Sequence, residues 1–490
     1  MIVNKLVSLS AVLIFLVTIK FSLTQIEIVT DTTTTEEEVS TIICSTCSCA
    51  DRAVNCANLN ITALFELPDW DGLRDFKPIK VNLTQNPITA VTRISKLPIQ
   101  ELNLSNCEIQ TLEDGSFLYL EDLSILDLSG NKITTSAINR KVFGGLLGID
   151  GPRDFTKLQY LSLANNDLHT LTQDIFLFMP FLLTLDLSGN PLAFIDQVTM
   201  GAISDLKNLR ELRLSGCELD TLPEGLLRRH RKLRRLDLSN NRFTTIPSVL
   251  REAPNLVYLN LDKISVQSLD ASTPLSNMTK LQELSLSRLS RLQNISAGAL
   301  SGLQDLVILR LNYNPRLTNL HPDFLVWMNE DDEELWPDLK ELYLNNNNLS
   351  VLDSGIIDGW NDLETGDFSN NPYNCDCKNQ WVVDVLVPLL VNTPANATVN
   401  NMVCKKPPDV RGLTFAQLNN ASRSLVCQEV ETITELPISN MAIILGIMIG
   451  IVVTFPIVLV LVLLWRKGFF TKCRNRKNYD SDDEHEHQNL

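Results

Sequence analysis

The sequence predicts an α/β solenoid in which short parallel strands stack along one curved sheet, with a cysteine-rich cap at each end and one membrane-spanning helix. Three observations lead to this fold class. A nine-residue frame with apolar positions recurs twelve times between Pro78 and Asn371, four cysteines flank the repeats on each side, and a long uncharged segment follows them. A frame repeated in this way indicates that each unit adds one supersecondary element to a growing array.

The frame reads Leu-x-x-Leu-x-Leu-x-x-Asn, with Cys or another residue replacing Asn in some copies, and it is clearest from Leu123 to Asn131 and from Leu158 to Asn166. Its copies are mostly 23 to 25 residues apart. This period is that of leucine-rich repeats, whose strands line a horseshoe. A leucine-rich helical bundle is the alternative, but the spacing is neither a heptad nor a 3.6-residue stripe. We therefore expect a leucine-rich repeat solenoid with a parallel β-sheet on its concave face.

Each position of the frame has an expected direction. The first, fourth and sixth positions point inward, and the third, fifth, seventh and eighth lie on the outer side of the strand. One unit cannot bury its leucines alone, but stacked units share a continuous core. At the ninth position an inward Asn can satisfy loop backbone groups, and Cys107 and Cys217 take its place as small buried thiols. Because Ile264 and Leu289 interrupt this ladder, we expect less regular units around them.

The amino-terminal residues are typical of a secreted protein. Lys5 precedes an apolar run from Leu6 to Ile19, which is short for a membrane span and predicts a signal peptide over residues 1–24. Cleavage is expected between about Phe21 and Gln25, with an uncleaved signal anchor as the alternative. Residues 25–43 are rich in Thr and Glu and are interpreted as a disordered leader.

A second apolar segment predicts a transmembrane helix over residues 441–465. It contains no charged residue, and a helix of this length is about 37 Å long, against a hydrocarbon core of roughly 30 Å. Six Lys and Arg residues follow between Arg466 and Lys477, whereas none lies in the dozen residues before the segment. This asymmetry places the tail, 466–490, in the cytoplasm and the repeats outside. A cleaved lipid-anchor signal is disfavoured because a polar segment follows the span.

Eight cysteines lie in two groups outside the repeats. Four precede the first unit, in a segment assigned as an amino-terminal cap over 44–75, and four follow the twelve repeats of 76–371, in a carboxyl-terminal cap over 372–427 that precedes a stalk, 428–440. The cap cysteines are Cys44, Cys47, Cys49, Cys56, Cys375, Cys377, Cys404 and Cys427. In an oxidising compartment such groups form disulfides, although four cysteines allow three pairings. A zinc site is the alternative for the first group.

The spacing Cys44-x-x-Cys47-x-Cys49-x6-Cys56 resembles the amino-terminal cap of extracellular leucine-rich repeat proteins. The run Asn371-Pro-Tyr-Asn-Cys-Asp-Cys377 followed by Trp381 resembles their carboxyl-terminal cap. The resemblance covers residues 44–427. It implies that the disulfides alternate, joining Cys44 to Cys49, Cys47 to Cys56, Cys375 to Cys404 and Cys377 to Cys427.

The whole plan, together with the segment Asn314-Pro-Arg-Leu317 through Pro322, resembles membrane proteins of the tartan, capricious and vertebrate neuronal leucine-rich repeat group. That resemblance implies roles in cell adhesion, cell sorting and axon or synapse targeting. Two departures are visible. No immunoglobulin or fibronectin module follows the carboxyl-terminal cap, and the tail is much shorter than in Toll-like receptors and has no signalling domain.

Eight sequons lie in the predicted ectodomain, as expected for a secreted glycoprotein. They begin at Asn60, Asn82, Asn103, Asn277, Asn294, Asn348, Asn396 and Asn420. Asn82 and Asn103 occupy the fifth position of the first two units, so glycans there would obstruct that end of the concave face. We therefore expect an extracellular protein ligand on the middle and carboxyl-terminal strands. The outward residues assigned to this contact are Arg235, Asp237, Tyr258, Asp262, Arg310, Tyr313 and Tyr343. Tyr and Arg are frequent interface anchors, but ordinary solvated strand residues are the alternative.

Two long units and one basic stretch are further candidates. The units from Asn131 to Asn166 and from Asn314 to Asn347 carry insertions, and the second includes Trp327 and an acidic run, Glu330 to Glu334. Such loops carry recognition or are tolerated insertions. The stretch Arg228 to Arg235 holds six basic residues and His230, so it is a candidate heparin or acidic-partner site, with a solvated charged edge as the favoured alternative. In the span, Gly446-x-x-x-Gly450 is a candidate homodimer contact.

Composition and residue types disfavour catalysis and nucleic-acid binding. The formal net charge is −16, and charges of both signs are scattered through the repeats. The five histidines are dispersed, and we find no nucleophile motif, phosphate loop or metal-ligand spacing. We therefore expect no enzymatic activity, metal or cofactor. The leading hypothesis is a type I plasma-membrane protein for cell adhesion or cell–cell recognition. The alternative is an innate-immune or signalling co-receptor that binds a microbial or secreted ligand.

Overall fold

A computed structural model describes residues 42–144, 155–357, 363–394, 396–427 and 440–467. The chain divides into two units, one ending at Val426 and one beginning at Cys427, and each is described by itself. The predicted signal peptide, nearly all of the leader and the stalk, and the tail beyond Lys467 lie outside the described residues. So does the middle of the first insertion, residues 145–154.

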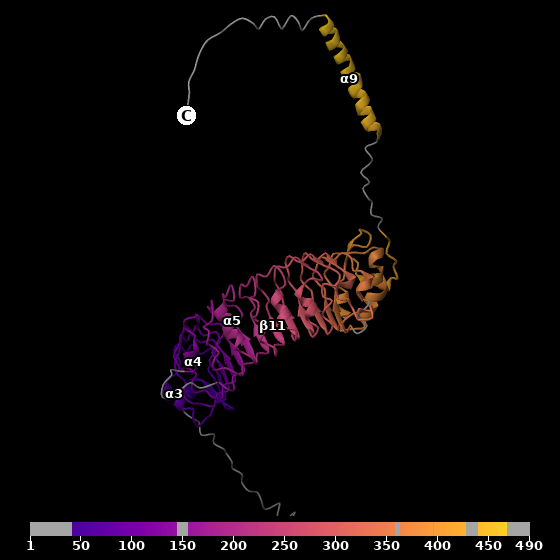
Figure 1. The fold of residues 1–490 in the computed structure, drawn as a ribbon. Coiled ribbons are helices and arrows are strands. Elements are labelled where there is room, and N and C mark those ends of the chain that lie inside the picture. The colour runs from indigo at the N-terminus through magenta and orange to yellow at the C-terminus, as the bar shows by residue number, and fades with distance from the viewer. Residues whose placement is uncertain (1–41, 145–154, 358–362, 395, 428–439, 468–490) are drawn as a thin grey trace, which may run out of the picture. The chain divides into compact units, whose positions relative to one another are not determined.

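The first unit is a solenoid built on one fourteen-stranded sheet (Figure 1). A hairpin of antiparallel strands opens the sheet, and twelve parallel strands, one per predicted repeat, follow it. In order they are β1 (Ser48–Ala50), β2 (Ala53–Asn55), β3 (Lys80–Asn82), β5 (Glu101–Asn103), β7 (Ile125–Asp127), β8 (Tyr160–Ser162), β9 (Thr184–Asp186), β10 (Glu211–Arg213), β11 (Arg235–Asp237), β12 (Tyr258–Asn260), β14 (Glu283–Ser285), β16 (Ile308–Arg310), β20 (Glu341–Tyr343) and β21 (Thr365–Asp367). The predicted α/β leucine-rich repeat solenoid is confirmed.

The core follows the inward positions of the frame. In the repeat that contains β7, Leu123, Leu126 and Leu128 are fully buried, and the equivalent leucines of neighbouring units are buried with them in one continuous cluster. The strands pair in register, so that fourth positions such as Leu212 and Leu236 lie side by side. Burying leucines along such a row stabilises each unit through its neighbours.

The ninth-position ladder is present. The Asn131 side chain donates to the carbonyl groups of Leu104 and Leu128 at 2.9 and 2.8 Å and accepts from the backbone N–H groups of Cys107 and Ile109, both at 3.0 Å. Each such Asn therefore ties its own turn to the preceding unit. Loss of one of these bonds would cost free energy of folding, because a buried backbone group without its partner has no water to bond.

Cysteine at the ninth position replaces the hydrogen-bond donor of asparagine but not its acceptor. The buried Cys107 thiol donates to the carbonyl of Leu83 at 3.1 Å, and Cys217 donates to that of Leu187 at 3.3 Å. Burial raises the pKa of Cys217 to about 12, which keeps the thiol protonated as a donor. The predicted irregularity around Ile264 and Leu289 does not reach the sheet, because β11, β12, β14 and β16 keep an unbroken parallel register.

The eighth position has a requirement that the frame did not reveal. All twelve eighth positions have positive φ, among them Asn106 (54°), Gly130 (66°) and Tyr313 (60°). The chain turns out of each strand here in the left-handed region, which favours Gly and Asn. The seventh-position side chains consequently fold toward the neighbouring unit, and several are buried, including Ser239 and Ser287. The prediction that seventh positions lie on the outer side is therefore wrong for these residues.

Short elements cover the side of most units away from the sheet. The helices are α3 (Leu67–Asp71), α4 (Arg140–Gly144) and α5 (Gln197–Ser204), with 3₁₀ turns η1 (Ser248–Glu252), η2 (Pro274–Asn277), η3 (Pro322–Phe324) and η4 (Ser354–Ile357). Two small parallel sheets also form, β4 (Ala90–Val91) with β6 (Thr111–Leu112), and β13 (Ser268–Leu269), β15 (Asn294–Ile295) and β17 (Asn319–Leu320). In the first insertion, Phe143 on α4 packs on Phe117 and Phe155.

Disulfides hold both caps. At the amino end Cys44 bonds to Cys49 and Cys47 to Cys56, which is the alternating pattern that the resemblance implies. The cap begins earlier than expected, because α2 spans Ile42–Thr46 and Ile43 is fully buried, so the end of the predicted leader is part of the core. At the carboxyl end Cys375 bonds to Cys404, and Cys377 and Cys427 are disulfide-bonded as well.

The carboxyl-terminal cap is mainly helical. Its elements are β22 (Tyr373–Asn374), η5 (Cys377–Asn379), the π-turn η6 (Val382–Leu386), α6 (Val387–Val391), α7 (Asn396–Val399), β23 (Cys404–Lys406) and α8 (Phe415–Asn420). Tyr373 is fully buried against Phe415 and donates its hydroxyl to the carbonyl of Phe368 at 2.6 Å. The cap therefore shields the last leucines of the solenoid.

The second unit contains one long helix, α9 (Asn440–Arg466), close to the predicted 441–465. Within it, Gly446–Arg466 is long and apolar enough to cross a membrane, by length and composition. Added Cβ atoms on Gly446 and Gly450 would meet no neighbouring atom. Pro456 lies inside the helix, where it removes one backbone donor.

Candidate recognition surface

The outward side chains of β10, β11, β12, β14, β16 and β20 form one continuous surface, called the sheet face below. Their third positions pair in register, which places Glu211, Arg235, Tyr258 and Glu283 in a single row across four strands. Their fifth positions form a second row that contains Arg213, Asp237 and Arg310. The frame therefore converts residues 24 or so apart in sequence into direct neighbours.

Arg235 and Tyr258 form the first anchor pair on this surface. The Arg235 guanidinium lies 3.9 Å from the centre of the Tyr258 ring, and its Nε is 3.7 Å from Glu211. The Arg235 side chain remains 47% exposed. Burial, followed by the charges of Asp237 and Glu283, raises the pKa of the Tyr258 phenol, so the hydroxyl stays neutral and can donate. Stacked Arg and Tyr side chains offer a rigid surface with little entropy to lose.

Arg310 and Tyr343 form the second pair. The Arg310 guanidinium pairs with Glu283, lies 3.9 Å from Glu341, and is 5.5 Å from the Tyr343 ring centre. The Tyr343 hydroxyl donates to Glu341 at 3.0 Å. Burial and this bond raise the pKa of Tyr343. Both pairs thus consist of a cation over a ring with acidic residues beside it.

Two of the predicted contact residues also make hydrogen bonds within the sheet. Asp237 accepts from the backbone N–H of Ser239 at 2.9 Å and from the Asn260 side chain at 3.3 Å. Asp262 stands at a seventh position and accepts from the Ser285 hydroxyl at 2.6 Å and the Ser287 N–H at 2.8 Å. These carboxylates hold strand ends together, and their contact with a ligand stays a prediction.

Tyr313 lies at the edge of the sheet face. It occupies an eighth position with positive φ, is 46% exposed, and its ring centre is 5.5 Å from the Arg288 guanidinium. Sequence reasoning missed Arg288 and the acidic partners Glu211, Glu283 and Glu341. Aligning the third positions of consecutive units would have found the three acids, because each lies one strand from an arginine.

The repeat frame divides the basic stretch: His230 lies in the core, whereas Arg228, Arg229, Arg231 and Lys232 are exposed, and binding of heparin or an acidic partner there stays a prediction. His230 is buried at 1% exposure, with Nδ1 3.2 Å from the carbonyl of Leu206. Arg228 pairs with Glu252 at 3.0 Å, and Lys232 donates to Asn208 at 2.7 Å. Arg235 belongs to the sheet face. The alternation of inward and outward positions divides the stretch among the core, the edge and the sheet.

The second insertion is an ordered hairpin. Strands β18 (Trp327–Met328) and β19 (Glu334–Leu335) pair antiparallel, and the Asn329 side chain accepts from the N–H groups of Asp331 and Glu333 across the tip. The acidic residues of Glu330 to Glu334 are all exposed.

The sequons differ in accessibility. Asn82 and Asn103 pair directly on β3 and β5, half-buried, with each Oδ1 accepting a backbone N–H two residues on. Asn294 is also half-buried, and Asn60, Asn348, Asn396 and Asn420 are exposed. The side chain of Asn277 lies outside the described residues. Within the described ranges, no group of three His, Cys, Asp or Glu side chains could hold a metal ion.

Comparison with known proteins agrees with this architecture. Family models described as leucine rich repeats match residues 98–149, 156–219 and 207–263, and a further one matches 338–360. These residues of the chain are therefore leucine-rich repeats in sequence as well as in fold. It is 30% identical over 193 residues to chaoptin of Drosophila melanogaster, and 29% identical over 166 residues to Receptor-like protein 35 of Arabidopsis thaliana.

These alignments are partial. They cover 35% and 34% of this chain but only 14% and 17% of the two relatives, so the chain spans less than a fifth of their length. A solved leucine-rich repeat protein of Leptospira interrogans is similar over 67% of this chain and 81% of its own, with 24% identity and a TM-score of 0.49.

Proposed function

We propose that this chain is a single-pass plasma-membrane protein that recognises a protein ligand through its sheet face, in cell adhesion or cell–cell recognition. The observation that carries the proposal is the presence of two Arg–Tyr pairs on one continuous surface, Arg235 with Tyr258 and Arg310 with Tyr343. Both pairs are partly exposed and held in place by neighbouring strands. Such preordered aromatic and guanidinium groups are the residue types that dominate protein interfaces.

The opposite end of the same sheet is less suited to a ligand. Asn82 and Asn103 are neighbouring sequon residues there, and two glycans on adjacent strands would cover the first units. We therefore propose that glycosylation restricts the ligand to the middle and carboxyl-terminal strands. The cleaved signal peptide and the membrane span of 441–465 are parts of the same proposal, as is membership of the tartan and capricious group.

Two features support the membrane address. Gly446–Arg466 has the length and composition of a span, and Arg466 begins a cluster of six basic residues, as the positive-inside rule requires for a cytoplasmic tail. The disulfides of both caps fit an oxidising compartment.

A co-receptor role is the second candidate, since Receptor-like protein 35 is a receptor-like protein by name. A clustering assay separates the two. Cells that express the full chain are mixed in suspension with each other, with unmodified cells, and with conditioned medium. Clustering without an added factor supports adhesion, and clustering only with a secreted factor supports the co-receptor. If neither occurs at high surface expression, both proposals are wrong.

A further inference from the structure

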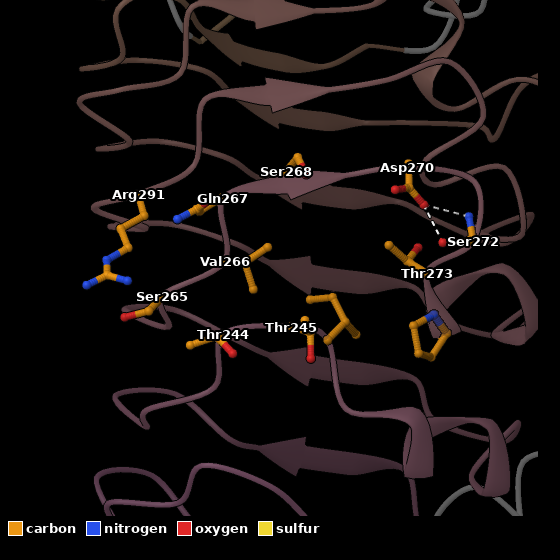
Figure 2. Close-up of a pocket in the computed structure, with 12 residues that line it drawn as sticks. Thr244, Thr245, Ser265, Val266, Gln267, Ser268, Asp270, Ser272, Thr273 and Arg291 are labelled. Atoms are coloured by element: carbon orange, nitrogen blue, oxygen red, sulfur yellow. Dashed lines mark hydrogen bonds between the residues drawn. The ribbon is translucent and has the colours of Figure 1, made fainter.

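An open groove lies on the outer side of the solenoid, away from the sheet face, between the units of β11 and β12 (Figure 2). Its volume is about 590 Å³. One wall is formed by Thr244 to Ile246 and the other by Ser265 to Ser268, which lead into β13. It is called the β13 groove below.

The groove runs along the free edge of a sheet. In the order β13, β15, β17, strand β13 has a partner on one side only. Each later strand donates to the one before it: the N–H of Ser296 bonds to the carbonyl of Leu269 at 3.0 Å, and the N–H of His321 bonds to that of Ile295 at 2.9 Å. An edge strand presents unpaired N–H and C=O groups that can pair with another chain.

The equivalent bonds one unit earlier are missing. They would join the N–H of Ser268 to the carbonyl of Thr244, and the N–H of Asp270 to that of Ile246, but neither bond forms among these described residues. The two segments are joined just before the groove, where the N–H of Ser265 donates to the carbonyl of Phe243 at 2.8 Å. The chain leaves the strand path after Ile246, because Pro247 is the N-cap residue of the 3₁₀ turn η1, which starts at Ser248. The N–H groups of Ser268 and Asp270 and the carbonyl groups of Thr244 and Ile246 therefore have no backbone partner across the groove.

The side chains of the groove are also available. The hydroxyl groups of Thr244, Thr245, Ser265 and Ser268 make no hydrogen bond within the described chain, and all four side chains are exposed or half-buried. Figure 2 shows Arg291 beside Gln267 at one end of the groove and Asp270 at the other. The ends thus carry opposite charges, at the start and the end of β13.

We propose that the β13 groove binds an extended peptide segment of a protein partner as an added strand, parallel to β13. The peptide backbone would pair with Ser268 and Asp270 on one side and with Thr244 and Ile246 on the other. An acidic residue at its amino end would lie near Arg291, and a basic residue at its carboxyl end near Asp270. Strand addition supplies affinity through the main chain and specificity through the side chains.

The regular amide spacing favours a peptide over a sugar, because the unmet backbone groups alternate as they do between paired strands. The site is independent of the sheet face, which lies on a different side of each unit. If the sheet face proves not to bind a ligand, the β13 groove can still be tested by itself, and the reverse also holds.

The probe is the fluorescently labelled peptide Ac-Glu-Thr-Val-Thr-Val-Lys-NH2, titrated by anisotropy against the full chain in detergent micelles. We expect saturable binding that weakens at least about tenfold, or 1.4 kcal/mol, when alternate amides of the peptide are N-methylated. Exchanging its Glu and Lys should weaken binding as well. These comparisons use the unaltered protein, so they do not depend on a variant folding.

The matching protein variant is Thr245→Trp, which fills the groove. Its control is Thr111→Trp, at the same repeat position on the exposed surface of β6. We expect Thr245→Trp to lose binding at least about tenfold and Thr111→Trp to bind as the wild type does. Absent binding, equal binding by Thr245→Trp, insensitivity to N-methylation, or displacement of the peptide by chitotriose would each overturn the proposal.

Discussion

At the residue scale, the ninth position shows how one side chain replaces several backbone contacts. Asn241 is buried, accepts from the N–H groups of Cys217 and Leu219 at 3.1 and 3.0 Å, and donates to the carbonyl groups of Leu214 and Leu238. Two neighbouring units therefore depend on a single amide. Cysteine tolerates the same place because its thiol can supply the donor.

Replacing Asn241 with alanine should lower the free energy of unfolding by about 3 kcal/mol, since several buried backbone groups lose their partners. Thermal and urea unfolding of the full chain in detergent measure the change. Asn240→Gly is the matched control, because Asn240 is exposed with φ of 56°, which glycine adopts freely. A loss of less than about 0.5 kcal/mol in Asn241→Ala would show that the ladder is not essential.

His230 gives the solenoid a pH dependence. Burial lowers its pKa below the ordinary value, against a smaller opposing effect of the Leu206 carbonyl. As the pH falls below about 6.5 the unfolded chain takes up a proton that the folded chain refuses, so stability decreases until the folded pKa is reached. The contribution is fully present above the unfolded pKa.

Between pH 7.5 and 5.0 we therefore expect the Tm of the wild type to fall by about 2 °C more than that of His230→Phe, which cannot titrate. Differential scanning calorimetry at several pH values measures both slopes. Parallel pH profiles for the two proteins would contradict the assignment.

At the element scale, two glycines have contrasting surroundings: one lies on the free surface of a helix, and the other lies at a contact between two units. Gly201 lies in α5, where an added Cβ would meet nothing within 4 Å. At Gly302 an added Cβ would lie 1.9 Å from the carbonyl oxygen of Ser276, in the preceding unit. The same substitution should therefore have opposite effects at the two places.

Gly201→Ala should stabilise the protein by up to about 1 kcal/mol, because alanine favours the helix. Gly302→Ala should destabilise it by about 2 kcal/mol or more, because backbone has to move. Urea midpoints of the two variants provide the comparison. Equal effects would mean that the turns away from the sheet pack loosely.

Features that depend on a single kind of interaction, such as burial of the frame leucines, could be predicted from the sequence. The leucines of the frame, such as Leu126 and Leu161, specify strand, direction and burial together. The left-handed eighth position was not recognised, because Lys263, Arg288 and Tyr313 obscure the preference for Gly and Asn. The bonds of Asp262 to Ser285 and Ser287 could not be foreseen for the same reason, since the turn that follows Asp262 decides where its carboxylate lies.

At the scale of the whole molecule, the repeat predicts which residues lie on the sheet face, but not which side chains contact one another there. The residues of the sheet face could be numbered in advance, and Arg235, Tyr258, Arg310 and Tyr343 lie together on it. Their acidic partners and the β13 groove could not be foreseen, because they depend on which units lack a neighbour and on where Pro247 ends a strand path. The sequence thus predicted the arginine and tyrosine residues of the candidate site, but not the acidic residues beside them.

The most direct test of the account is cell clustering by the triple variant Tyr258→Ala, Arg310→Ala and Tyr343→Ala at matched surface expression. Tyr160→Ala is the control, since Tyr160 is a half-buried third-position residue of the same sheet on β8. If the sheet face of β10 to β20 binds the ligand, the triple variant should cluster at least about tenfold less than the wild type, and Tyr160→Ala should match the wild type. Full clustering by the triple variant would contradict the central claim.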